Sequence, residues 1–197
     1  MPSKAQELFE AALSGVEYEC RHVRAAAVDQ MGAMIDVCPH QSDRIVAVVV
    51  DACCEQWSEL RKAGITQVPS LIRGCTERAH ELAQLVTEAC SDVEPLVRIE
   101  ALGNLLETME TCSDSASNLF DTLLCCSTDE NVVVQRCAKR LVNKAVKLCP
   151  DLAADILLDK MQCANAADLE RTRGESNKRH IASDEGTSDR GKKSKLG

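Results

Sequence analysis

Residues 92–106, DVEPLVRIEALGNLL, decide the fold, because their pattern of residue types returns elsewhere in the chain. A valine, a polar residue and an alanine recur with a period of 37 residues, as Val97-Arg98-Ala101, Val134-Gln135-Ala138 and, two periods earlier, Val23-Arg24-Ala27. A cysteine follows each valine by fifteen residues, at Cys38, Cys112 and Cys149. A period of this length is typical of helical hairpins that bury their apolar faces against one another. Between residues 40 and 92 no clean member of the frame is evident, so we expect a divergent repeat or a lone long helix there.

Composition favours the same fold class. Apolar residues make up 45% of the 197 residues and aromatic residues only 2%, so the core must consist mainly of aliphatic residues and cysteine. Such residues favour helix packing over a β-sandwich, which would require aromatic and β-branched strands. We therefore predict an all-α fold, a HEAT-like α-solenoid of about four helical hairpins over residues 1–170.

Helical spacing of the apolar residues, with capping and breaking residues, predicts about eight helices. Pro39 ends the second of them, because proline cannot continue the hydrogen-bond ladder, and Gly64 is interpreted as the C-cap of the third. The expected ranges are roughly 4–15, 17–38, 42–63, 66–90, 94–111, 114–126, 131–149 and 151–163.

Charge separates the chain into an acidic body and a basic tail. Residues 171–197 hold eight Lys or Arg and four Asp or Glu, a net charge of +4. Because the whole chain has a net charge of −8, the remaining residues carry −8 − 4 = −12. The tail is polar and almost free of large apolar groups, which predicts disorder. Its two basic clusters have the spacing of a two-part nuclear localisation signal, with a solubilising charged tail as the alternative. The clusters are Lys178, Arg179, Lys192, Lys193 and Lys195.

Several classes of function are disfavoured by the sequence. An acidic body with few aromatics is a poor platform for nucleic acid, because phosphates are repelled and bases find nothing to stack on. No apolar run approaches the length of a membrane span, and residues 1–7 lack a signal-peptide centre. No catalytic motif is present, so we expect neither an enzyme nor a cofactor.

The twelve cysteines leave one rival class open, a metal- or thiol-dependent protein. No C-x2-C spacing occurs, and only two Cys-x-His pairs are present, Cys20/His22 and Cys38/His40. Most cysteines fall where a small buried apolar residue would, a role that free cysteine fills well. We therefore expect no metal site.

Three residues are candidates for partner binding. Arg24 and Arg98 follow the repeat valine, and could form an anion-binding ladder, since arginine favours bidentate anion contacts. The structural alternative is that each pairs with the preceding aspartate and ties neighbouring repeats. Trp57, the single tryptophan, is either partly buried core or an anchor at an interface.

The second half of the chain also carries a family resemblance, which follows an ordered series of segments. These are Ala101-Leu102-Gly103-Asn104-Leu105, a short helix from Ala116 to Leu124, Val134-Gln135-Arg136 with Leu141-Val142, Cys149-Pro150 with Asp155-Ile156-Leu157-Leu158, and a polar stretch with Lys178-Arg179 and Lys192-Lys193-Ser194-Lys195-Leu196. From Asp92 onward the chain resembles the end of the N-terminal HEAT domain of symplekins.

The resemblance implies a non-enzymatic nuclear scaffold that joins subunits of the mRNA cleavage and polyadenylation machinery. It also implies docking of a phosphatase that acts on the RNA polymerase II C-terminal domain. Another nuclear HEAT scaffold, of the kind found in condensin or cohesin, shares the fold and the nuclear address. Only the identity of the partners would separate the two hypotheses.

Overall fold

Every secondary-structure element in the described part of the chain is helical, so the predicted all-α class is confirmed. The computed structural model describes residues 4–158 and 160, and its contacts divide the chain into two units, Met1–Ala153 and Ala154–Gly197. The α-helices are α1 (Lys4–Val16), α2 (Arg21–Val28), α3 (Met31–Val37), α4 (Ser42–Cys53), α5 (Ser58–Gly74), α6 (Ala79–Ala89), α7 (Pro95–Thr111), α8 (Ala116–Cys126) and α9 (Val132–Leu148). Short 3-10 turns, η1 (Pro39–Gln41), η2 (Thr76–Arg78) and η3 (Ser113–Ser115), precede α4, α6 and α8.

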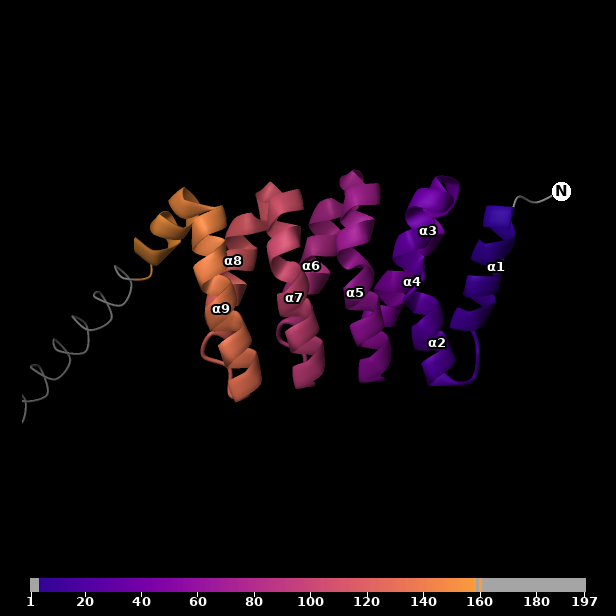
Figure 1. Ribbon diagram of the computed structural model, residues 1–197, viewed down its shortest axis with the longest axis horizontal. Helices are drawn as coiled ribbons and strands as arrows, with labels where there is room; N and C mark the ends of the chain where they lie inside the picture. The colour runs from indigo at the N-terminus through magenta and orange to yellow at the C-terminus, as the bar shows by residue number, and fades with distance from the viewer. Residues whose placement is uncertain (1–3, 159, 161–197) are drawn as a thin grey trace, which may run out of the picture. The chain divides into compact units, whose positions relative to one another are not determined.

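Helices of the first unit lie side by side in two layers (Figure 1). The first layer contains α1, α4, α6 and α8, and the second contains α2 with α3, then α5, α7 and α9. Within each hairpin a first-layer helix packs against the second-layer helix that follows it, and consecutive second-layer helices pack against each other. None of the described helices is long and apolar enough to cross a membrane.

The repeat frame is complete in the structure. Helices α5, α7 and α9 each have 17 residues and begin 37 residues apart. The repeat that the sequence did not reveal is therefore α4 with α5, in which Leu60 and Gly64 stand where the other repeats have valine and alanine. Gly64 lies inside α5 rather than at a C-cap, and a Cβ there would come within 2.8 Å of Cys53 Sγ and 3.0 Å of Cys53 N, so α4 approaches too closely for alanine.

Helix boundaries were predicted well in the second half of the chain and poorly before it. The expected helix over 17–38 is two helices, α2 and α3, separated at Asp29-Gln30. The expected boundaries of the helices over 42–63 and 66–90 are wrong. A loop at residues 54–57 ends α4, and α5 runs from Ser58 through Pro69 to Gly74. Residues 150–158 are helical, which agrees with the first part of the helix predicted over 151–163. The remainder of that range and the basic tail lie outside the described residues.

An amide side chain from the next repeat compensates each of the two helix interruptions. Pro69 has no N–H, so the carbonyl of Ile65 loses its helical partner, and Asn104 Nδ2 donates to that carbonyl at 2.8 Å. Gly32 lies just past the break between α2 and α3, and its N–H donates to Gln67 Oε1 at 3.1 Å. Gly32 and Pro69 are 37 residues apart and share one position of the repeat frame. Gln67 and Asn104 are also 37 residues apart and share another.

Cysteine packs as a small apolar residue at five of the eleven described positions, fewer than the sequence suggested. Three cysteines of the repeat frame, Cys38, Cys75 and Cys112, are buried, whereas the fourth, Cys149, is partly exposed. The eleven cysteines of the described residues are free thiols.

Candidate functional site

Three arginines form a ladder of ion pairs along the second layer. Each pairs with an acid 31 residues further on, in the loop that joins the two helices of the next repeat. The pairs are Arg24–Glu55, Arg61–Asp92 and Arg98–Asp129, and we call them the arginine ladder. Arg61 Nε lies 2.6 Å from Asp92 Oδ2 and its Nη2 lies 2.8 Å from Oδ1, a bidentate geometry that is strong and specific. Arg98 Nη2 lies 2.9 Å from Asp129 Oδ1.

The same side chains fasten the loops. Arg98 Nη1 donates to the backbone carbonyl of Asp92 at 2.7 Å, and its partner Asp129 also accepts the N–H of Asn131 at 2.7 Å. Arg61 and its partner make the corresponding bonds one repeat earlier. The rungs of Arg61 and Arg98 therefore each join two repeats and fasten the loops at both ends.

Burial makes the ladder a structural element. The side chains of Arg98 and Asp129 are only 7% and 11% exposed, and those of Arg61 and Asp92 are 14% and 10% exposed. Burial is the largest single influence and alone would raise the pKa of Asp92 and Asp129. The hydrogen bonds from their arginines, the backbone N–H groups that they accept and the attraction of the guanidinium charges together outweigh it, so both pKa values fall below the ordinary value. Both acids are thus ionised and neutralise their arginines, which leaves these guanidinium groups little capacity for an outside anion.

This geometry bears on two of the sequence candidates. Arg24 and Arg98 are both held in ion pairs, which favours the structural interpretation over an anion-binding one. The carboxylate partner comes from the following repeat, whereas the preceding Asp92 offers Arg98 only its carbonyl oxygen. Sequence reasoning overlooked Arg61, although it lies 37 residues after Arg24 and 37 before Arg98.

Trp57, the third candidate, is not a core residue. It is 40% exposed and immediately precedes α5. The guanidinium carbon of Arg21 lies 4.6 Å from the centre of a Trp57 ring, a cation–π contact, and Arg21 also lies 3.7 Å from Glu59. The stack holds the indole in an ordered position while leaving part of it open to solvent.

Trp57 belongs to a row of exposed apolar side chains at one edge of the first unit. Seven of the ten large hydrophobic residues that are exposed within residues 4–153 fall in the loops between the paired helices or in the first turns of α2, α7 and α9. We call this set the apolar edge: Tyr18, Val23, Trp57, Val93, Leu96, Val132 and Val133. Figure 1 shows these loops at the lower end of the helices, one per hairpin. Scattered single hydrophobic residues are normal on a surface, but a repeated row is typical of an interaction site.

Acidic residues accompany the apolar edge. Glu17, Glu19, Glu94 and Glu130 are exposed in the same loops. Between the first two loops a pocket of about 520 Å³ has an aliphatic floor that includes Val28, Val48 and Leu60. Four carboxylates and one arginine line the same pocket, at Glu17, Glu19, Asp51, Glu55 and Arg24. An aliphatic floor beneath a mainly acidic rim matches the stem and the charge of a lysine or arginine side chain.

Thiols and metals give no comparable site in the described residues. Cys126 Sγ donates to the backbone carbonyl oxygen of Cys90 at 3.7 Å. Burial raises the pKa of Cys53 to about 12, so its thiolate is scarce at neutral pH. Within residues 4–158 and 160, no group of three or more His, Cys, Asp or Glu side chains is arranged to hold a metal ion.

Comparison with protein-family models, with curated protein sequences and with solved structures finds no match to this chain.

Proposed function

We propose that this chain is a non-enzymatic scaffold, folded as a HEAT-like α-solenoid, that binds a protein partner along its apolar edge. The observation that carries the proposal is that exposed apolar residues recur in all four hairpins, either in the loop between the paired helices or in the first turn of the helix that follows it. Leu96 is 68% exposed and Val93 is 84% exposed, although each lies next to a buried rung of the arginine ladder. Rigid loops that present apolar side chains can bind with little loss of conformational entropy.

The partner that fits this edge carries basic and apolar residues together. The acidic residues of the loops and the acidic rim of the pocket favour cations, and the apolar edge favours aliphatic or aromatic contacts. Opposite charges would steer the encounter and set the register, while the apolar contacts would supply most of the affinity. Trp57 is the residue we expect to contribute most, because tryptophan is enriched among the residues that dominate binding energy.

A charge substitution on the edge tests this function. The double variant Leu96→Asp/Val133→Asp should lose partner binding in quantitative affinity capture from cells, because both exposed side chains would carry charge into the interface. The matched control is Leu8→Asp/Val37→Asp, which changes a leucine and a valine of similar exposure outside the edge. If both double variants capture the same proteins as the unaltered chain, the edge is not the binding surface.

We further propose that the scaffold is symplekin-like and nuclear, and that its partners are mRNA 3′-end processing subunits and a phosphatase of the RNA polymerase II C-terminal domain. The support for this is the resemblance of the segments from Asp92 onward and the basic clusters of residues 178–195. Mass spectrometry of the captured proteins tests it: cleavage and polyadenylation subunits would support it, whereas condensin or cohesin subunits would replace it with the rival scaffold. Stoichiometric zinc in the purified protein would instead favour the metal-dependent class.

The localisation proposal has its own test. Deleting residues 171–197 from a chain fused to a bulky reporter should abolish nuclear accumulation, because the deletion removes both basic clusters. A reporter that still accumulates in the nucleus would show that residues 171–197 are not required for nuclear localisation.

A further inference from the structure

Helix α9 differs in charge from the rest of the first unit. It contains five cationic residues and no aspartate or glutamate. All five are exposed: Arg136, Lys139, Arg140, Lys144 and Lys147. The chain as a whole is acidic, so this is a local reversal of charge rather than an average property.

The cations of α9 also differ in their contacts. Each of the seven arginines that precede α9 forms an ion pair with an acid. None of the five cations of α9 lies in an ion pair within the part of the chain that the structure describes. Although the chain has 31 acidic residues, no described acid forms an ion pair with these five cations.

Helix geometry gathers these cations into one stripe. Arg136, Arg140, Lys144 and Lys147 are separated by three or four residues, which places them on one face of the helix, and we call them the basic strip. At 1.5 Å per residue the strip is roughly 16 Å long. Neighbouring like charges at this spacing repel and destabilise the helix, so the strip is unfavourable for folding by itself.

A purely structural explanation accounts for only part of the strip. A cation in the last turn interacts favourably with the helix dipole, which explains Lys147. Arg136 and Lys139 lie in the first half of α9, where the dipole does not favour a positive charge. The repeat itself does not require cations here, because the positions equivalent to Lys144 and Lys147 in α7 are Glu107 and Glu110.

We propose that the basic strip of α9 is a binding site for a short acidic segment of a partner protein, bound through its carboxylate or phosphate groups. Arginine side chains bind both groups in a bidentate manner, and two of the four cations of the strip are arginines. An acidic segment of about five extended residues matches the length of the strip. This inference concerns a surface separate from the apolar edge and does not depend on the function proposed for that edge.

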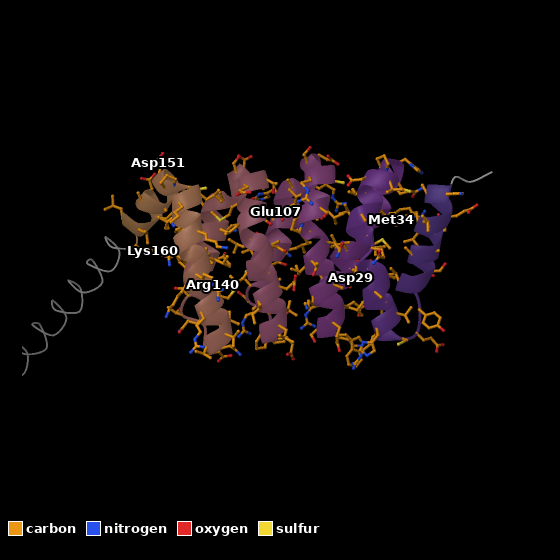
Figure 2. The ribbon with its side chains drawn as sticks, in the orientation of Figure 1. Asp29, Met34, Glu107, Arg140, Asp151 and Lys160 are labelled. Carbon is orange, nitrogen blue, oxygen red and sulfur yellow. The ribbon has the colours of Figure 1, made fainter. Side chains whose placement is uncertain are left out.

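The width of the strip favours a peptide over a nucleic acid. Helix α7 packs against α9, and packed helices lie about 8–10 Å apart. Figure 2 shows Arg140 on α9 and Glu107 on the adjacent α7. A nucleic-acid duplex is wider than one helix, so its phosphates would meet the exposed Glu107 and Glu110 of α7. A single peptide segment is narrow enough to follow the cations of one helix.

The test uses the full chain and a fluorescein-labelled octaglutamate peptide, with binding followed by fluorescence anisotropy. We expect the dissociation constant to rise about tenfold between 50 and 200 mM salt, because exposed charges are screened. The neutral variant Arg136→Gln/Arg140→Gln should weaken binding about tenfold, since it removes half of the strip without introducing new charge. Circular dichroism checks that the variant is folded, and Lys144→Gln/Lys147→Gln provides a second pair if it is not.

Two controls separate the strip from other cations. Lys62→Gln/Arg73→Gln alters second-layer cations that already form ion pairs, and should leave peptide binding unchanged. Lys192→Gln/Lys193→Gln/Lys195→Gln neutralises the C-terminal cluster. If this triple variant loses peptide binding while the α9 variants retain it, the proposal is overturned. Tighter binding of a 20-base-pair DNA duplex than of the peptide would overturn the choice of an acidic protein segment.

Discussion

The hydrogen bond between Asn104 and the carbonyl of Ile65 makes a sharp prediction about stability. Pro69 removes the N–H that would normally satisfy this carbonyl, and Asn104 Nδ2 replaces it at 2.8 Å. Ile65 is 1% exposed, so water has little access to the carbonyl when Asn104 is truncated. Asn104→Ala should therefore leave a buried acceptor unsatisfied, the more expensive way to lose a hydrogen bond.

The size of the effect follows from that burial. An unsatisfied buried acceptor costs about 1–3 kcal/mol, so we expect Asn104→Ala to lower the free energy of unfolding by about 2 kcal/mol. For a chain of this length, that corresponds to a fall in Tm of about 4–8 °C. Asn143→Ala is the matched control, because Asn143 is exposed on α9, and its effect should stay within about 0.5 kcal/mol.

A second substitution distinguishes the proposed cause from a general packing defect. Pro69→Ala restores an N–H at the position that can donate to the Ile65 carbonyl within α5. In that background Asn104→Ala should cost less than about 0.5 kcal/mol, which gives a coupling energy of about 1–2 kcal/mol in a double-mutant cycle. Urea unfolding followed by circular dichroism measures all four proteins. An equal cost of Asn104→Ala with proline and with alanine at position 69 would refute the reasoning.

Three further predictions concern the ladder, the glycines and the core. Asp129→Asn leaves the buried Arg98 without its counterion and should lower stability by about 3 kcal/mol in urea unfolding at pH 7. The pKa of Asp129 in the folded chain is depressed below its unfolded value of about 3.9, so this stabilisation is present above about pH 4 and is lost as the pH falls through the folded pKa. The free energies of unfolding of the variant and the unaltered chain should therefore converge in acid. Gly103→Ala should raise the free energy of unfolding by about 0.5–1 kcal/mol, because a Cβ there meets nothing within 4 Å, whereas Gly64→Ala should lower it. Ala138→Asp or Ala101→Asp should unfold the array, because both sites are 0% exposed and would bury an unpaired charge; an unchanged melting curve would contradict the packing.

Sequence reasoning succeeded where local signals and the repeat frame agreed. The expected helices over 94–111, 114–126 and 131–149 match α7, α8 and α9 within one or two residues. Pro95 lies at the start of α7, where its missing N–H is harmless, and the side chain of Asn131 caps α9. In this half of the chain the breaking residues stand at the helix ends, so propensity and tertiary structure give the same boundaries.

The first half was predicted poorly because its breaking residues lie inside a helix. Gly64 and Pro69 both mark helix ends by propensity, yet both lie within α5. The amide that makes Pro69 tolerable lies 35 residues away at Asn104, beyond any local window. The in-frame residues Arg61 and Cys75 could have revealed the missing repeat, since side chains that tie repeats keep the period when core residues drift.

The two proposed binding surfaces also differ in how far the sequence predicts them. The basic strip is legible in the sequence, because residues 132–148 hold five cations and no acid. The sequence does not predict that these cations lack ion pairs, because that depends on which acids the fold brings close to them. The apolar edge required knowledge of exposure, because Leu96 and Val133 stand next to buried valines in the same helix turn and only packing separates them.

The ladder and the apolar edge use the same loops, so the proposed binding should depend on the ladder. Asp92 accepts two hydrogen bonds from Arg61 and also accepts the N–H of Glu94, so a single carboxylate ties the repeats together and shapes the loop that presents Val93 and Leu96. Removing the carboxylate would free that loop even if the helices remained packed, and the apolar side chains would then lose conformational entropy on binding. Asp92→Asn should therefore weaken partner binding more than its loss of stability alone explains. A variant that is destabilised but binds its partner with unchanged affinity would separate the ladder from the docking function.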